Sequence, residues 1–278
     1  MQLQKIIFIF LISFLIHNVS QAQDPYVRAP LAGREMATND QAVIPQRFMA
    51  LTNANVVDVR SGNIIRDVTV VLKDGKILSV GKGTPPSGAE VIDLRGYYIT
   101  PGLFEGHFHG ASAGDAKRAL VSGVTTAKGA SVDGFMDVAL SDMVKAGYLV
   151  GPDIMPAGVY VTPELGNTGA ILADPRLYKY ANQELYGEEA LRDVVSITID
   201  RGAQWIKTRS SGLTSRTSGP DALAQAYTDS ELGAIMDEAA KYNVPVSCHS
   251  HGVEVIIAAI EAGCTSIEHA SYIDDEGL

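Results

Sequence analysis

Positive charge is scarce in this sequence, and the scarcity excludes one class of partner. The 278 residues include 22 lysines and arginines against 32 aspartates and glutamates, which gives a formal net charge of −10. No run of basic residues stands out that could neutralise the phosphates of a nucleic acid. We therefore expect no nucleic-acid partner. The sequence does not indicate an oligomeric state.

Cysteine is also rare, with Cys248 and Cys264 as the two examples. Both lie in apolar segments that are strand-like or flank a strand. The sequence favours two buried thiols there, and a disulfide between them is the alternative. No cysteine lies near residue 22, so a lipid-modified cysteine is not expected at that point.

Long apolar runs are missing except at the amino terminus, where residues 6–16 are almost continuously apolar. The run follows Lys5 and is short for a membrane span. Small residues then occupy Ser20 and Ala22. We predict a signal peptide over residues 1–22, cleaved after Ala22, and export to the periplasm or beyond the cell with no membrane association afterwards. An uncleaved membrane anchor is the alternative.

The rest of the chain changes character twice. Residues 23–45 are polar with scattered proline and glycine, and we expect an exposed leader. Residues 46–99 alternate short strand-like segments with turns, of which Asp74-Gly75 is typical of a tight hairpin. This segment predicts a small β-sandwich module. From residue 100 to 278, strands alternate with helices, which indicates parallel strands with helical crossovers.

This α/β region predicts a (β/α)8 barrel of the TIM type with about six β/α units present. Strand-like runs cover residues 103–109, 125–127, 153–159, 205–208, 244–248 and 266–268. Helical runs cover residues 113–122, 135–146, 188–201, 229–241 and 252–262, and Thr228 or Asp229 is a candidate cap of the fourth. A full barrel has eight units. We expect a barrel without its last two units, and an open sheet is the alternative.

Two histidines at the end of the first strand-like run indicate a metal. His107 and His109 are two residues apart, so in a strand both imidazoles point to one face. Zinc and similar ions bind such nitrogens. Three more residues, Lys207, His249 and His269, lie at or just after the ends of later strands. In a parallel α/β barrel these ends share one face, where active sites lie.

Each of these residues has a simpler interpretation. The histidine pair could be a satisfied pair in a core. A lysine at a strand end is more often solvated, although a buried Lys207 would have a lowered pKa and could react with carbon dioxide to give a bridging carbamate. His251 lies two positions after His249, and we assign it to substrate contact. The alternative for His251 is a surface position at a helix start. The joint pattern favours the metal site.

The motifs around these residues resemble those of metal-dependent amidohydrolases, closest to the branch of imidazolonepropionase-like enzymes and secreted Xaa-Pro dipeptidase-type hydrolases. The resemblance runs from about residue 48 to residue 278. It rests on five motifs: Thr100-Pro101-Gly102-Leu103 leading into His107-Phe108-His109, Gly123-Val124-Thr125-Thr126, Trp205-Ile206-Lys207, residues 246–252, and Ser266-Ile267-Glu268-His269.

The resemblance implies a site for two divalent ions, usually zinc. Carried over by position, His107 and His109 bind the more buried ion, and His249 and His269 bind the second. Lys207, as a carboxylated lysine, bridges both. The resemblance places a substrate contact at Tyr160. It implies hydrolysis of an amide-like carbon–nitrogen bond, in a cyclic amide, an N-acyl amino acid or a dipeptide, by a metal-activated water.

The sequence departs from the family pattern at three places. Glu105 stands where an aspartate is usual, and residues 208–212 replace a glycine pair. The aspartate expected on the last barrel strand, a metal ligand and general base, has no counterpart up to Leu278. Two alternatives to the enzyme therefore stay open: a truncated, non-catalytic, exported metal-binding fragment, and an open-sheet binding protein without metal.

Overall fold

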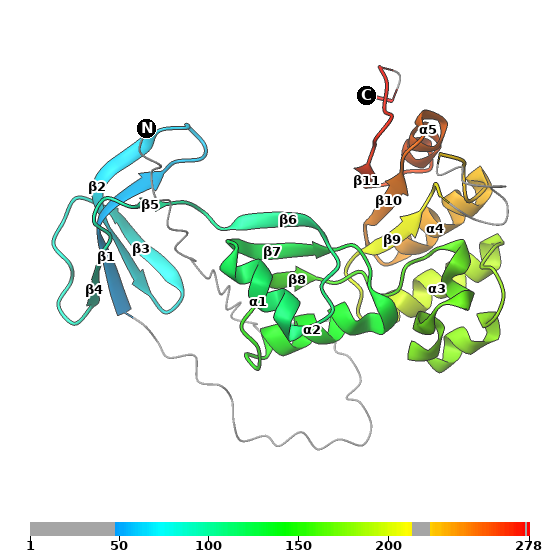
Figure 1. Cartoon of the computed structure of the whole chain (residues 1–278), viewed down its shortest axis with the longest axis horizontal. Coiled ribbons are helices and arrows are strands. Elements are labelled where there is room, and N and C mark those ends of the chain that lie inside the picture. The colour runs from blue at the N-terminus through cyan, green and yellow to red at the C-terminus, as the bar shows by residue number, and fades with distance from the viewer. Residues whose placement is uncertain (1–47, 213–222, 276) are drawn as a thin grey trace. The chain divides into compact units, whose positions relative to one another are not determined.

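The computed structural model describes residues 48–212, 223–275 and 277–278 (Figure 1). The predicted signal peptide and leader lie outside these residues. The chain divides into two compact units: Met1–Phe104 with Ala116–Thr126 and Ala146–Pro152, and Glu105–Asp115 with Ala127–Lys145 and Asp153–Leu278. Within the described part of the chain, the helices are too short or too polar to cross a bilayer.

The first unit contains a five-stranded sheet. Its strands are β1 (Phe48–Val57), β2 (Ile64–Lys73), β3 (Lys76–Gly81), β4 (Glu90–Asp93) and β5 (Tyr98–Ile99), in the order β3-β2-β1-β4 with β5 also paired to β1. The predicted hairpin joins β2 to β3, because Asp74 and Gly75 both adopt the positive φ that a tight turn requires. Leu51, Val70 and Ile99 are buried together in one small hydrophobic core. The second layer of a sandwich stays a prediction.

Two further sheets carry the α/β region. One has the order β6-β7-β8, formed by Leu103–Phe108, Val124–Gly129 and Asp153–Met155. The other has the order β11-β10-β9, formed by Ser266–His269, Val246–Ser250 and Ile206–Arg209, and its pairs are parallel. The α-helices are α1 (Ala113–Val121), α2 (Met136–Lys145), α3 (Glu188–Asp200), α4 (Asp229–Lys241) and α5 (Val253–Glu261).

Every strand-like and helical run predicted after residue 100 overlaps an element of that type, which confirms the mixed α/β class. The run at residues 153–159 is the least accurate, since β8 ends at Met155. Pro156 has no N–H for a ladder bond, and Gly158 adopts a positive φ. The sequence did not indicate four short 3-10 helices: one precedes α2 at Asp133–Phe135, and three follow β8 at Pro163–Asn167, Gly169–Ala173 and Pro175–Tyr180.

The segment after β8 runs beside β9. Gln204 N–H donates to the Pro156 carbonyl at 2.8 Å, and Val161 forms a parallel bridge with Thr208. The Thr208 hydroxyl also donates to the Val161 carbonyl at 3.0 Å. These bonds tie the edge that follows β8 to the β9 edge of the other sheet.

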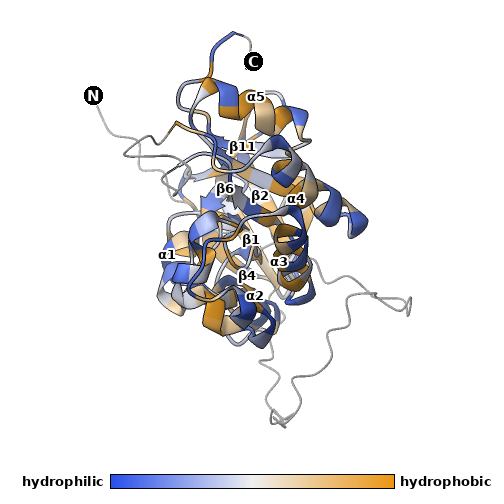
Figure 2. Ribbon diagram, turned by 90° about the vertical axis from the view of Figure 1, so that its right-hand side faces the viewer, coloured by the Kyte–Doolittle hydropathy of each residue, from blue (hydrophilic) through white to orange (hydrophobic). Residues whose placement is uncertain are grey.

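Helices α3 and α4 cover the main core of the second unit. Leu191 and Val195 of α3 and Leu232 and Ile235 of α4 are buried in one cluster with Val246 of β10. Figure 2 shows apolar and polar residues alternating along both helices, as expected of helices with one buried face. The predicted cap is confirmed, because Thr228 is the N-cap of α4 and forms a capping box with Glu231.

The preference for two free thiols was wrong. Cys248 in β10 and Cys264 form a disulfide, with their Cα atoms 6.3 Å apart. The crossover through α5 returns the chain beside β10, where Ser266 pairs with Ser247. Cys264 therefore arrives next to Cys248, although 16 positions separate them in sequence.

Candidate metal centre

Five of the six histidines of the chain gather at the carboxyl ends of β6, β10 and β11. His107 lies 4.8 Å from both His109 and His269 between ring centroids, and His269 lies 4.6 Å from His249. His251 completes the group at 4.5 Å from His249. The sixth, His17, is outside the described residues. The structure thus brings together the four histidines predicted as ligands.

The hydrogen bonds of His107 and His109 leave one ring nitrogen of each available for a cation. His109 Nδ1 lies 2.6 Å from the Ser131 carbonyl, and His107 Nδ1 contacts the Glu268 carboxylate. A carbonyl and a carboxylate accept hydrogen bonds, so both Nδ1 atoms carry the proton. The two Nε2 atoms lie 3.0 Å apart with their lone pairs free for a shared ligand.

His269 joins the cluster because the backbone at the end of β11 departs from strand geometry. Successive strand residues point to opposite faces, so Glu268 and His269 would normally diverge. His269 and Ala270 instead adopt φ values of 73° and 47°, in the left-handed region. Such backbone conformations are uncommon outside glycine and occur often at functional sites. The turn brings the His269 ring to those of His107 and His249.

His249, His251 and His269 offer ring nitrogens within 4.8 Å of one another. Burial, together with the neighbouring histidines, lowers the pKa of His249 to about 3, and burial also lowers the pKa of His269. Both imidazoles are therefore neutral near pH 7, and the neutral form is the one that binds metal.

His251 lies beside the rings of His249 and His269. Its ring stacks on that of His269, with centroids 5.0 Å apart and planes 17° apart. Its Nδ1 lies 2.9 Å from the Ser271 hydroxyl. His251 thus borders the same space as the four predicted ligands, and its predicted role in substrate contact stays a prediction.

Lys207 is buried, with its side chain 1% exposed. Among the described residues, its Nζ has no hydrogen-bond partner, and the nearest carboxylate oxygen is Glu268 Oε2 at 3.8 Å. Burial lowers the pKa of Lys207 to about 8, against the raising effect of Glu268. The sequence placed Lys207 at the end of its strand; it is the second of four residues in β9, which directs its side chain into the interior.

Tyr160 lies beside this lysine. Lys207 Nζ is 5.9 Å from the centre of the Tyr160 ring, and the guanidinium carbon of Arg209 is 5.2 Å from it. Burial raises the pKa of Tyr160 to about 12, so the phenol stays protonated. The predicted substrate contact is therefore near the cluster, next to Arg209, which the sequence did not single out.

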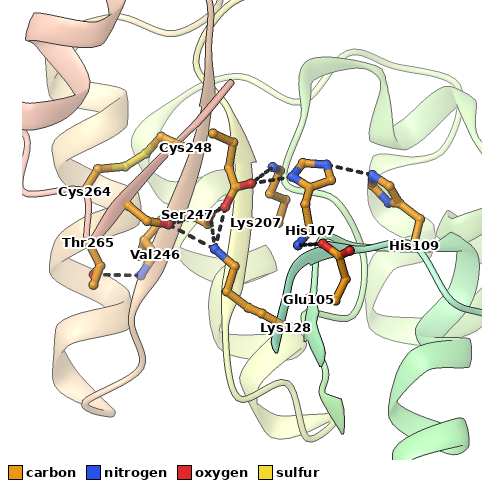
Figure 3. Close-up of polar contacts among 12 residues, drawn as sticks. Glu105, His107, His109, Lys128, Lys207, Val246, Ser247, Cys248, Cys264 and Thr265 are labelled. Atoms are coloured by element: carbon orange, nitrogen blue, oxygen red, sulfur yellow. Dashed lines mark hydrogen bonds and ion pairs between the residues drawn. A yellow bond between two sulfur atoms is a disulfide. The ribbon is translucent and has the colours of Figure 1, made fainter. Parts of the chain in front are cut away.

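Sequence reasoning also missed Glu268 and Lys128. Figure 3 shows His107, Lys128, Ser247 and Lys207 converging, and their common partner is the Glu268 carboxylate. Burial would raise the pKa of Glu268, but hydrogen bonds from Lys128, Ser247 and His107 hold it well below its usual range. The sequence signal that could have identified them is a charged residue inside a short strand, Lys128 in β7 and Glu268 in β11, where apolar residues are usual.

The donor set fits divalent metal ions. Four imidazoles are close together, the two on β6 present Nε2 lone pairs to one point, and His249 and His269 are neutral. The Lys207 amine, which has no hydrogen-bond partner among the described residues, lies 3.8 Å from the same carboxylate that fixes His107. Nitrogen ligands of this kind suit zinc and several other first-row ions.

Comparison with known proteins agrees with this chemistry. The model of the amidohydrolase family matches residues 98–278, well over half of the chain. The chain belongs to the amidohydrolase family.

Several individual relatives are similar over most of the chain. Ochratoxinase from Aspergillus niger is 28% identical over an alignment of 289 residues, gaps included. The alignment covers 90% of this chain and 58% of that protein. Its crystal structure matches with a TM-score of 0.62 at 25% identity, over 84% of this chain and 62% of that one. A Xaa-Pro dipeptidase with methionine bound in its active site matches with a TM-score of 0.66 at 26% identity, over 83% and 63%. The chain thus spans about 60% of the length of these relatives.

Proposed function

We propose that this protein is a metal-dependent hydrolase of amide-like carbon–nitrogen bonds. The observation that carries the proposal is the meeting of four histidines at strand ends, beside a buried lysine without a hydrogen-bond partner among the described residues, in a chain of the amidohydrolase family. Substrates of the class would be a cyclic amide, an N-acyl amino acid or a dipeptide. The names of the relatives, an ochratoxinase and a Xaa-Pro dipeptidase, support a small molecule or a dipeptide.

Each residue has a proposed role toward two divalent ions, for which we propose zinc. His107 and His109 would hold one ion, His249 and His269 would hold the other, and Lys207, once carboxylated by carbon dioxide, would be a ligand shared by both. When bound, the ions supply a water with a pKa lowered toward about 7 and polarise the scissile carbonyl. The low pKa of Lys207 supports carbamate formation, since the neutral amine is the reactive form.

The remaining residues orient the ligands and the substrate. Ser131 and Glu268 fix the proton on Nδ1 of the β6 histidines, so that both Nε2 atoms stay available. His251 and Tyr160 are proposed substrate contacts, and both lie beside the cluster.

The proposal extends to the architecture and the compartment. We propose that the two α/β sheets belong to a (β/α)8 barrel, because the segment after β8 hydrogen-bonds to β9 and amidohydrolases are structural neighbours. We propose export through the residue 1–22 signal peptide. The Cys248–Cys264 disulfide supports export, since such bonds persist in oxidising compartments.

A pair of single-histidine variants tests the function. The zinc-loaded protein is assayed for hydrolysis of a panel of N-acyl amino acids, Xaa-Pro dipeptides and cyclic amides. We expect turnover that a chelator abolishes. His249→Asn should lose turnover together with one ion. His251→Asn should keep both ions and lose turnover, as a substrate contact would.

Three results would change the assignment. Bound ions with no turnover on the whole panel would favour a non-catalytic metal-binding protein. Turnover that survives complete metal removal would refute metal-dependent hydrolysis. Loss of an ion in His251→Asn would make His251 a ligand.

A further inference from the structure

We propose that Glu268, clamped by Lys128, is a positioning residue that fixes the ring of His107 for metal binding. The inference rests on the proposed function, because it concerns the same site. It assigns a role to two residues that lie outside the proposed ligand set. It also extends the metal centre from the histidines to the buried residues Lys128 and Glu268.

The two oxygens of Glu268 have different partners. Oε2 faces the metal site, where it accepts from His107 Nδ1 and lies 3.8 Å from Lys207 Nζ. Oε1 faces the other way, where it accepts from Lys128 Nζ at 2.5 Å and from the Ser247 hydroxyl. The Glu268 carboxylate thus connects the proposed ligand His107 to Lys128 on β7 and Ser247 on β10.

Lys128 is committed to holding this carboxylate. Its side chain is 10% exposed, and its ammonium also donates to the hydroxyls of Ser247 and Ser266 at 3.3 and 3.2 Å. The same ammonium lies 4.7 Å from the centre of the Trp205 ring. With three oxygen acceptors and an aromatic face, Lys128 has little freedom to move, so it holds Oε1 in place.

This arrangement has a geometric consequence for His107. An imidazole on a strand end can rotate about its side-chain bonds and can carry its proton on either nitrogen. The Glu268 oxygen at Nδ1 selects one tautomer and one ring orientation, and it directs Nε2 toward His109 Nε2 at 3.0 Å. Carboxylates behind metal-binding histidines typically strengthen metal affinity 10- to 100-fold.

A purely structural ion pair is the competing explanation. Buried pairs contribute little net stability relative to apolar residues, so stability alone gives weak grounds for Lys128 and Glu268. A structural pair would also have no need for the contact to His107. The two explanations differ in what they predict for metal affinity and for ligand-field spectra.

The test is to titrate metal-free protein with Zn2+ in competition with a chelating dye, and to record the visible spectrum of the Co2+ form. We expect Glu268→Gln to weaken binding of at least one ion by about 10- to 100-fold and to shift the cobalt bands. Glu268→Asp should recover part of the affinity. Lys128→Met should weaken binding in the same direction, and it remains informative if Glu268→Gln does not fold.

Glu231→Gln is the matched control. Glu231, at the start of α4 and outside the group of five histidines, is also a buried glutamate, with 4% exposure, and it accepts from the backbone N–H groups of Gly187 and Thr228. This variant should lose thermal stability and keep wild-type zinc affinity and cobalt bands.

Wild-type affinity and spectrum in folded Glu268→Gln or Lys128→Met would overturn the inference and leave the proposed function intact. An equal loss of affinity in Glu231→Gln would also overturn it, since the effect would then be general destabilisation. Failure of the wild-type protein to bind any ion would overturn the proposed function and this inference together.

Discussion

Lys207 is a buried lysine whose amine has no hydrogen-bond partner among the described residues. A buried ammonium needs hydrogen bonds or a close counter-charge, and Lys207 has neither within 3.5 Å among the described residues. Its lowered pKa follows from this burial. A lowered pKa increases the fraction of neutral amine, which is the form that reacts with carbon dioxide to give a carbamate.

Lys207→Met tests that interpretation, because methionine keeps the length and removes the amine. We expect the purified variant to hold about one ion fewer than the wild-type protein, measured by elemental analysis after gel filtration. Folding should be retained, because Lys128, Ser247 and His107 still hydrogen-bond the Glu268 carboxylate when the Lys207 amine is removed. Lys241→Met is the control, because the Lys241 side chain is 59% exposed and pairs with Glu238. Retention of both ions in Lys207→Met would refute the bridging role.

At the scale of elements, the β10–α5–β11 crossover delivers three of the five clustered histidines. His249 and His251 lie at its start and His269 at its end, so the relative placement of β10 and β11 sets their spacing. The Cys248–Cys264 disulfide closes this unit directly beside His249. The bond therefore stabilises the element on which the site depends.

Cys264→Ser removes the bond and leaves the buried Cys248 in place. Opening a loop of this size should lower the free energy of unfolding by about 3 kcal/mol, because the unfolded chain gains freedom. Urea denaturation measures the loss. The wild-type protein should weaken by a similar amount under reductant, and the variant should not respond. Two free thiols in the native, unreduced wild-type protein would contradict the disulfide.

The start of α4 gives a second prediction at this scale. Thr228 accepts from the Glu231 N–H at 3.3 Å, and Glu231 Oε2 accepts from the Thr228 N–H at 2.9 Å. Thr228→Ala should lower the free energy of unfolding by about 1 kcal/mol, and Thr228→Ser should retain most of it. Thermal or urea denaturation distinguishes them, and equal stability of the two variants would show that the cap contributes nothing.

At the scale of the whole molecule, the α/β order was predictable from the sequence, because alternating strand and helix patterns are local. The same holds for His107 and His109, whose common face follows from strand geometry alone. The direction of the His269 ring could not be derived from strand geometry, since it depends on the left-handed backbone of His269 and Ala270.

Other features depend on contacts between segments that are distant in sequence, and no local sequence pattern predicts such contacts. The Cys248–Cys264 bond follows from how tightly α5 folds back on β10. The Lys128–Glu268 pair joins residues 140 positions apart on two different sheets. The position of His251 beside His269 follows from the end of β11 rather than from its own segment.

The most direct test of the central claim is the metal content of the purified protein, measured by elemental analysis and followed by thermal denaturation with and without a chelator. We predict close to two zinc or similar divalent ions per chain, and a lower melting temperature once they are removed. A metal-free protein whose melting temperature is the same with chelator and with added zinc would contradict the account.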